Sequence, residues 1–304
     1  MQNKKRKMTI LVTGSNGQLG MSIRKIRHEY PHAEFVFTDI VEDKDTQYLD
    51  ITDIGQIRRM ATEYHPEAIV NCAAYTNVEK AESDYDNALL INATAVRNLA
   101  TVANESNILL VHISTDYVFG NEPYNTPCNE ERQGTPTGVY GLTKLHGEQA
   151  IQELCKRYLI VRTSWLYSEY GRNFVKTILA LMREREEIRV VCDQTGTPTY
   201  ATDLARALLT MVMEYQGEEM SGIYHYSNEG TCSWYDLAMH VKRIEGNTSC
   251  KIVPCRSSEF PSPVTRPAYS VLDKSKVKET FDGKVKVPYW TDSLMECCSY
   301  LNQY

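Results

Sequence analysis

The sequence predicts an α/β protein with a doubly wound parallel sheet and a smaller C-terminal α+β lobe. Short apolar segments alternate with helical patterns through the first half of the chain, which is the order expected of parallel strands joined by helices. The apolar segments are continuous, as in strands that are buried on both faces. A glycine-rich turn follows the first of them, at the place where such sheets bind ligands.

The elements of this sheet follow in order along the chain. Strands are expected where apolar, β-prone residues run together, at 10–12, 35–37, 68–70, 108–113 and 159–161. Helices are expected where apolar residues recur every three or four positions, at 18–28, 54–64, 88–103 and 140–155. Pro31 should end the first helix, which argues against a metal site in the zinc-protease-like stretch from His28 to His32.

The regular alternation of strand and helix patterns ends after about residue 163. Loops at 192–200 and 254–267 hold much of the proline, while a helix near 203–214 and a strand at 223–225 are expected to return to the sheet. We therefore expect one domain at 1–163 with a return segment near 201–226, and a substrate-binding lobe at 164–200 and 227–304. The cleft between the two is the expected ligand site.

The composition is that of a globular protein with a sizeable core. Of the 304 residues, 42% are hydrophobic and 24% are charged, with 33 Lys+Arg against 39 Asp+Glu. The resulting net charge of -6 argues against a nucleic-acid partner. Nine cysteines without a Cys-x-x-Cys pair indicate reduced thiols and a cytoplasmic location. No apolar run reaches the length of about 18 residues that a membrane span needs.

The turn after the first strand is a candidate dinucleotide site. Gly14, Gly17 and Gly20 form a G-x-x-G-x-x-G arrangement, in which backbone amides can approach a diphosphate at a helix N-terminus. Asp39 follows the second strand, where its carboxylate can accept hydrogen bonds from the adenosine ribose and repel a 2′-phosphate. A tight structural turn is the alternative. The combination predicts a Rossmann-type sheet that binds NADH or NADPH, with Asp39 favouring NADH.

A tyrosine and a lysine one helical turn apart are candidate catalytic groups. Tyr140 and Lys144 share a helix face, and the nearby ammonium is expected to lower the pKa of the phenol. Such a phenol can give a proton to a carbonyl while a nicotinamide delivers hydride. Thr115 ends the fourth strand, at the ligand-binding edge, so its hydroxyl could share the same oxygen. A surface pair is the alternative for Tyr140 and Lys144 taken alone.

Further segments follow a pattern known from one family. They lie at 71–82, 114–119, 139–144, 161–167, 173–174, 193–199 and 266–267. With the glycine loop, they make the sequence similar to the extended short-chain dehydrogenase/reductases and, more narrowly, to the dTDP-4-dehydrorhamnose reductase family. The resemblance extends from residue 8 to about residue 275. It departs from the family pattern at Cys72, where alanine is expected, and at Glu79, where aspartate is common.

The resemblance implies reduction of the C4 ketone of dTDP-4-dehydro-L-rhamnose (dTDP-6-deoxy-L-lyxo-4-hexulose) to dTDP-L-rhamnose by NADPH or NADH. Tyr140 would donate the proton, Lys144 would hold the nicotinamide ribose, and Thr115 would orient the ketone. The substrate-binding residues that follow are Thr115, Asp116, Trp165, Asn173 and Arg266, the last for the diphosphate. The expected cofactor-binding residues are Gly14, Asn16, Gly17, Gln18, Leu19, Gly20, Asp39, Asp50, Ile51, Cys72, Ala73, Ala74, Tyr140 and Lys144. The resemblance also associates Mg²⁺ and a homodimer contact with some members, although no ligand cluster in the sequence supports a metal.

Two other functions fit parts of the pattern. A nucleotide-sugar 4,6-dehydratase or epimerase would share the fold. Resemblance to the dehydratases would imply the sequence Thr-Asp-Glu at the end of strand four, with the glutamate as base. Here Asp116 is followed by Tyr117 instead. A non-catalytic subunit, similar to the regulatory β subunit of methionine adenosyltransferase, would need none of Thr115, Tyr140 and Lys144. The presence of these three residues favours the reductase.

Overall fold

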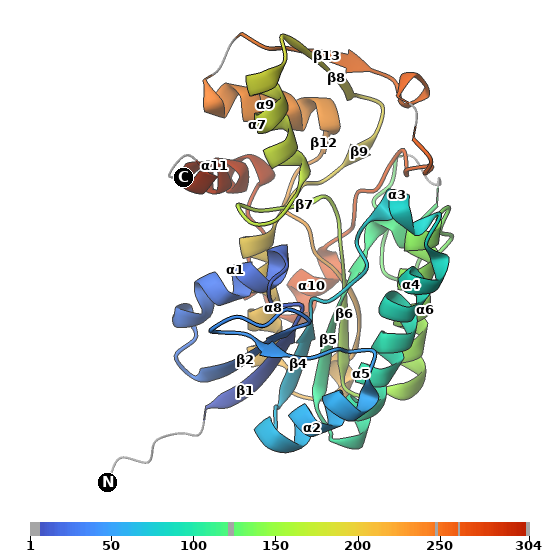
Figure 1. The fold of residues 1–304 in the computed structure, drawn as a ribbon, viewed down its shortest axis with the longest axis vertical. Helices are drawn as coiled ribbons and strands as arrows, with labels where there is room; N and C mark the ends of the chain where they lie inside the picture. The colour runs from blue at the N-terminus through green and yellow to red at the C-terminus, as the bar shows by residue number, and fades with distance from the viewer. Residues whose placement is uncertain (1–6, 121–124, 247–248, 261, 302–304) are drawn as a thin grey trace.

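The central feature of the computed structural model is a parallel sheet covered by helices on both faces (Figure 1). The structure describes residues 7–120, 125–246, 249–260 and 262–301, so residues 1–6 of the basic leader lie outside it. The strands are ordered β11-β6-β5-β4-β1-β2-β3. Their bounds are Met8–Thr13 (β1), Ala33–Asp39 (β2), Gln47–Tyr48 (β3), Ala68–Asn71 (β4), Leu109–Thr115 (β5), Tyr158–Thr163 (β6) and Gly222–His225 (β11). All neighbouring strands run parallel, which confirms the predicted doubly wound sheet.

Alternate side chains of β1 point into two different cores. Ile10 and Val12 are fully buried with helices α1 (Gln18–Ile26) and α8 (Ala201–Glu214). Leu11 is buried on the opposite face, with α2 (Ile54–Tyr64), α5 (Ala95–Glu105) and α6 (Val139–Leu154). Because β1 is buried on both faces, its sequence is a continuous apolar run without polar alternation.

Several expected elements differ from the structure at their ends. The first helix ends at Ile26 and continues as a 3-10 turn over Arg27–Glu29, so His28 and His32 do not share a helix. The helix expected at 88–103 is divided into α4 (Tyr85–Leu89), a π-helical turn (Leu90–Thr94) and α5. The apolar pattern showed a helix in this region but contained no signal for the π-helical turn, which depends on tertiary packing.

The segment after β6 builds a second group of elements, which Figure 1 shows above the sheet. Its bounds are β7 (Leu166–Tyr167), α7 (Phe174–Glu184), β8 (Glu187–Val191), β9 (Thr195–Gly196), β10 (Thr199–Tyr200), β12 (Cys232–Ser233), α9 (Trp234–Glu245), β13 (Lys251–Cys255) and α11 (Trp290–Leu301). These elements enclose their own apolar cluster, which includes the fully buried Val175, Leu237 and Leu294. The shorter elements are α3 (Val78–Ala81), α10 (Ser275–Thr280) and 3-10 turns at Asp116–Val118, Glu218–Met220 and Ser257–Glu259.

Between β10 and β12 in the sequence, the chain returns to the sheet as α8 and β11. α8 packs beside α1, and β11 pairs with β6 at the edge of the sheet. All nine cysteines are free thiols, as their spacing predicts. In the described ranges, no helix has both the length and the apolar character needed to cross a membrane.

Candidate active site

A cavity of about 920 Å³ lies at the carboxyl ends of the sheet strands. Its lining includes the residues that directly follow or end β1, β2, β4, β5 and β6, among them Gly14, Asp39, Cys72, Thr115 and Thr163. The parallel strands all point their carboxyl ends to this edge, so segments far apart in the sequence meet there. The cavity is large enough for a sizeable organic ligand.

The glycine loop forms one wall of the cavity. Gly14 has φ of +63°, and a Cβ built there would lie 2.5 Å from the backbone nitrogen of Ala73. Gly20 lies in the first turn of α1, and a Cβ there would lie 2.4 Å from the Cα of Ser15 in the loop. Both positions therefore require glycine, and the loop leaves backbone at the N-terminus of α1 open to the cavity. These features fit the diphosphate of a dinucleotide.

Asp39 sits at the far end of the same wall. Its Oδ2 accepts a hydrogen bond from the Asn16 backbone nitrogen at 3.0 Å. The Asn16 side chain in turn accepts from Arg24, whose guanidinium also pairs with Asp43 at 3.1 Å. The acid at the end of β2 is thus held in place beside the glycine loop, where the adenosine ribose was expected.

Most of the expected cofactor residues line the cavity together. They are Gly14, Gly17, Gln18, Leu19, Asp39, Asp50, Ile51, Cys72, Ala73, Ala74, Tyr140 and Lys144. Asn16 and Gly20 do not line it: Asn16 holds Asp39, and Gly20 lets α1 pack closely against the loop. These two residues therefore support the cavity lining without being part of it.

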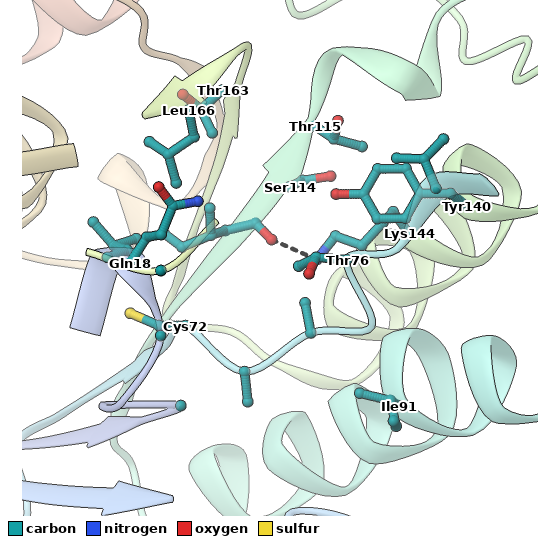
Figure 2. A pocket seen from close by; sticks show the side chains of 18 of the residues that line it. Gln18, Cys72, Thr76, Ile91, Ser114, Thr115, Tyr140, Lys144, Thr163 and Leu166 are labelled. Carbon is teal, nitrogen blue, oxygen red and sulfur yellow. Dashed lines mark hydrogen bonds between the residues drawn. The ribbon is translucent and has the colours of Figure 1, made fainter. Parts of the chain in front are cut away.

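Tyr140 and Thr115 lie close to each other in the lining of the cavity. In Figure 2 the Tyr140 hydroxyl points toward the end of β5 that carries Ser114 and Thr115, and Lys144 lies next to the ring. Burial raises the pKa of Tyr140 to about 12, and a hydrogen bond with Thr115 only partly opposes this rise. The expectation of a lowered pKa was wrong, because burial outweighs any influence of the lysine.

Lys144 is buried, with 2% of its surface exposed, so it is not part of a surface pair. Its Nζ donates to the Ile113 carbonyl at 2.5 Å and lies 3.2 Å from the Nε2 of His112. Burial lowers the pKa of Lys144 to about 8, and the charge of Glu148 acts in the opposite direction. The lysine is therefore a group that can titrate near neutral pH.

Asp116 is also buried, close to Tyr140. Its Oδ1 accepts from the Thr115 hydroxyl at 3.1 Å. Burial raises the pKa of Asp116 to about 6, with hydrogen bonds from Ser270 and Thr115 opposing the rise. Its negative charge also contributes to the raised pKa of Tyr140.

Two stacked tryptophans belong to the lining of the cavity. Trp165 has φ of +48° and stacks on Trp234 with ring centroids 3.6 Å apart. A Cβ on Gly196 would lie 2.5 Å from the Trp165 indole, so this glycine makes room for the ring. Both tryptophans line the cavity. Trp234 comes from α9 and was missed, because no motif marked it and only the fold brings it next to Trp165.

The arginines of the cavity include one that sequence reasoning missed. Arg266 lines the cavity and pairs with Glu79 at 2.9 Å, on the short helix α3. Arg172, which is exposed, lines it as well. Its signal was its position next to Asn173 in a segment already singled out.

Asn173 does not line the cavity. Its side chain caps α7 by accepting from the Lys176 nitrogen at 3.1 Å. Its amide group donates to the Gln18 Oε1 at 3.0 Å, and Gln18 does line the cavity. The structure therefore places Asn173 behind the wall, where it fixes Gln18 against the upper elements.

A metal ion bound by side chains alone needs several His, Cys, Asp or Glu donors close together. Across the described residues, no group of three or more His, Cys, Asp or Glu side chains could hold a metal ion.

Comparison with known proteins places the chain beside a set of reductases. The family model of the RmlD substrate binding domain matches residues 8–303. A Shigella flexneri protein named dTDP-4-dehydrorhamnose reductase is 38% identical over 93% of this chain and 94% of its own length. A Streptomyces niveus protein named dTDP-4-keto-6-deoxy-D-glucose reductase is 35% identical over 96% and 97%.

Solved structures give the same result. A dTDP-4-dehydrorhamnose reductase from Clostridium acetobutylicum is 41% identical, with a TM-score of 0.88 over 97% of this chain and 100% of that one. The reductase of Bacillus anthracis, solved in complex with NADP, is 37% identical, with a TM-score of 0.86 over 97% and 99%. The similarity covers both groups of elements that surround the cavity.

Proposed function

The chain belongs to the family of the RmlD substrate binding domain, and from this premise we propose that it is an NAD(P)H-dependent oxidoreductase. It reduces the C4 ketone of dTDP-4-dehydro-L-rhamnose to dTDP-L-rhamnose. The observation that carries the proposal is that one cavity joins the glycine loop to Tyr140, Thr115 and Lys144. A dinucleotide and a carbonyl substrate can therefore meet in it.

Tyr140 is the proton donor of this proposal. With its pKa raised to about 12, it is a phenol at neutral pH, which is the form that can give a proton away. The Thr115 hydroxyl orients the same ketone oxygen. When bound, the reduced nicotinamide supplies the hydride. Tyr140 gives its proton to the oxygen that gains negative charge, and the phenolate then takes a proton from water.

The two ligands are assigned to different walls of the cavity. The glycine loop with Asp39 holds the dinucleotide, and Lys144 donates to the nicotinamide ribose. Asp116, Trp165 and Trp234 hold the sugar nucleotide. The diphosphate is assigned to Arg266 and Arg172, because guanidinium groups bind phosphates in a bidentate manner.

The dehydratase alternative lacks its base in this site. Tyr117 lines the cavity directly after Asp116, where a dehydratase would need a carboxylate. Burial raises the pKa of Tyr117, so it stays a neutral phenol. A base that could remove a ring proton is therefore absent at this position.

The same proposal includes the wider organisation of the protein. We assign the dinucleotide to a domain of residues 1–163 and 201–226, and the sugar nucleotide to a lobe of 164–200 and 227–304. The buried cluster built mainly from α7, α9 and α11 supports a separate lobe. Val277, Phe281 and Val285, from the C-terminal range, pack in a cluster on the sheet instead. A cytoplasmic location, supported by the free thiols, and a homodimer belong to the proposal too. Sedimentation of the purified protein tests the dimer.

The test is a reductase assay with purified protein. NADH or NADPH is mixed with dTDP-4-dehydro-L-rhamnose or with dTDP-4-keto-6-deoxy-D-glucose, and loss of nicotinamide absorbance is followed. We expect oxidation of the cofactor only with the first sugar nucleotide. Turnover of the second sugar nucleotide alone would mean that this compound, and not the first, is the substrate. No turnover with any pair of cofactor and sugar nucleotide would overturn the proposal.

A further inference from the structure

Asn173 belongs to the upper elements, but one of its contacts crosses to the wall that holds the glycine loop. It directly precedes α7, and its side chain also contacts the loop at 168–170 and Gln18, the first residue of α1. Gln18 lines the cavity, whereas Asn173 does not. A residue that was expected to bind the sugar nucleotide therefore touches the wall assigned to the dinucleotide.

A backbone group fixes which way the Asn173 amide faces. The Lys176 nitrogen lies 3.1 Å from the Asn173 Oδ1, and a backbone N–H can only donate, so the oxygen faces Lys176. The Asn173 Nδ2 then faces the carbonyl oxygens of Ser168 at 2.7 Å and Tyr170 at 3.3 Å, which can only accept. Both ends of the amide agree on this one orientation.

The orientation of Asn173 decides that of Gln18. The Asn173 Nδ2 can only donate, so the Gln18 atom that lies 3.0 Å away must be the acceptor Oε1. The hydroxyl of Ser168, a fully buried residue, lies 3.1 Å from the same oxygen. The Gln18 Nε2 lies on the other branch of the carboxamide, and it makes no hydrogen bond to the residues that the structure describes. Figure 2 shows this side chain extending into the pocket, so its N–H donors are available to a ligand.

The loop that precedes Asn173 is itself attached to α1. Glu169 forms an ion pair with Lys25 at 2.7 Å, and the Glu169 side chain is only 7% exposed. Lys25 follows Gln18 by seven residues, so both lie on one face of the helix. A Cβ added to Gly171 would lie 3.0 Å from the Gln18 Cγ, so the loop covers this face closely. Asn173 therefore reaches Gln18 from a fixed position.

We propose that Asn173 is a positioning residue for the cofactor, which holds the Gln18 carboxamide so that its Nε2 donates to the dinucleotide diphosphate. This inference rests on the proposed function, which assigns the dinucleotide to the glycine loop. Gln18 opens α1, where the helix N-terminus favours a negative group, and an amide donor beside it adds to that effect. A carboxamide turned the other way would present its oxygen to the diphosphate and repel it.

Capping of α7 does not by itself account for an asparagine at this position. An N-cap needs only an oxygen that accepts from the helix, which Ser, Thr and Asp also supply. Among these four side chains, only asparagine accepts from the backbone with one atom and donates to Gln18 with another. Asn173→Ser therefore keeps the cap and removes the donor that fixes Gln18.

Fluorescence titration of the full chain with NADH is the first test. We expect Asn173→Ser to raise the Kd for NADH about tenfold, the lower end of what loss of a hydrogen bond to a charged group causes. Asn77→Ser makes the same exchange at the N-cap of α3, outside the cavity lining, and should leave the Kd unchanged. A Kd for Asn173→Ser equal to that of the wild type would overturn the proposal.

A double variant tests whether Asn173 acts through Gln18. Gln18→Met keeps a long side chain without the amide and should itself weaken NADH binding about tenfold or more. In this background Asn173→Ser should have almost no further effect on the Kd for NADH, because two residues that act through one contact are not additive. A full additional loss would show that Asn173 only supports its own loop, which contradicts the proposal.

Gln18→Glu tests the orientation of the carboxamide and does not alter the loop. The variant keeps the acceptor toward Asn173 but places a negative oxygen where Nε2 was. We expect the Kd for NADH to rise at least about a hundredfold, because the carboxylate repels the diphosphate. Gln216→Glu adds the same charge at an exposed position after α8 and should have no effect. Unchanged binding by Gln18→Glu would mean that Nε2 does not face the diphosphate.

Binding of dTDP separates this inference from the proposed function. We expect Asn173→Ser to change the Kd for dTDP less than the Kd for NADH, as measured by calorimetric titration. The reverse order would return Asn173 to the substrate side and overturn the inference, while the reductase function would stand. A wild-type protein that binds NADH through Gln18 but reduces no sugar nucleotide would remove the proposed reaction and leave the role of Asn173 in place. No binding of NADH by the wild type would overturn both.

Discussion

At the scale of single residues, the proposed mechanism assigns the proton transfer to Tyr140. Tyr140→Phe removes the phenol but keeps the ring, so the cavity retains its shape. We expect kcat/KM for ketone reduction to fall by about 10²- to 10⁴-fold, because this is the usual contribution of a positioned proton donor. Tyr64→Phe, on α2 and outside the cavity lining, is the matched control and should keep full activity. Full activity in Tyr140→Phe would exclude it as the donor.

The buried carboxylate of Asp116 lowers the stability of the folded protein at neutral pH. Its folded-state pKa of about 6 lies above the unfolded value of about 3.9. Its contribution to the free energy of unfolding is therefore complete below about pH 4 and is lost as the pH rises through about 6. Asp116→Asn keeps the acceptor for Thr115 without the buried charge. We expect it to raise the free energy of unfolding at pH 7 by about 3 kcal/mol, the value of a shift of about two pH units, and to have almost no such effect at pH 4.

Chemical denaturation at the two pH values measures this difference. Activity should fall in the same variant if Asp116 binds the sugar. A variant that is equally stabilised at both pH values would show that the buried charge is not the cause.

At the scale of elements, the turn between β1 and α1 must satisfy two conditions at once. Gly14 needs a positive φ, and it also needs room against the segment after β4. Gly246, at the end of α9, has φ of +69°, and a Cβ added there would meet nothing within 4 Å, so it needs only the first condition. Comparing Gly14→Ala with Gly246→Ala therefore separates backbone strain from crowding.

We expect Gly246→Ala to lower the free energy of unfolding by about 1 kcal/mol and to leave cofactor binding unchanged. Gly14→Ala adds the contact with Ala73 to the same strain, so it should cost more and should weaken NADH binding at least about tenfold. Thermal unfolding and a fluorescence titration with NADH measure the two effects. Equal effects of the two variants would show that the close approach to Ala73 is unimportant.

At the scale of the whole molecule, the cavity is completed by a helix from the upper elements. Trp234 on α9 supports Trp165, while the glycine loop belongs to the sheet. Trp234→Leu should therefore weaken the binding of dTDP by about 5- to 30-fold, as expected for loss of a stacked aromatic group, without changing the Kd for NADH. Trp234→Phe keeps an aromatic partner and should lose less. Calorimetric titration with each ligand checks this, and a parallel loss of NADH affinity would argue against two separate walls.

The sheet was predictable because its signals are local. Continuous apolar strands, the glycine turn and the spacing of Tyr140 and Lys144 can be read within a few residues of each other. Trp234 could not be found in this way, since only packing brings it to the cavity. The pKa of Tyr140 was misjudged for a related reason: sequence spacing shows which charge is near, but not how deeply the group is buried.

The return of the chain to the sheet also sets an order for folding during synthesis. The apolar face of α1, with Ile23 and Ile26, is covered by α8, which leaves the ribosome only after the segment that forms α7 to β10. β6 likewise has no outer neighbour until β11 has been made. A nascent chain that ends before residue 201 therefore carries an uncovered apolar face and an open strand edge, which are the features that recruit chaperones. The sheet and helix that carry the glycine loop are therefore fully covered only after about residue 225 has been made.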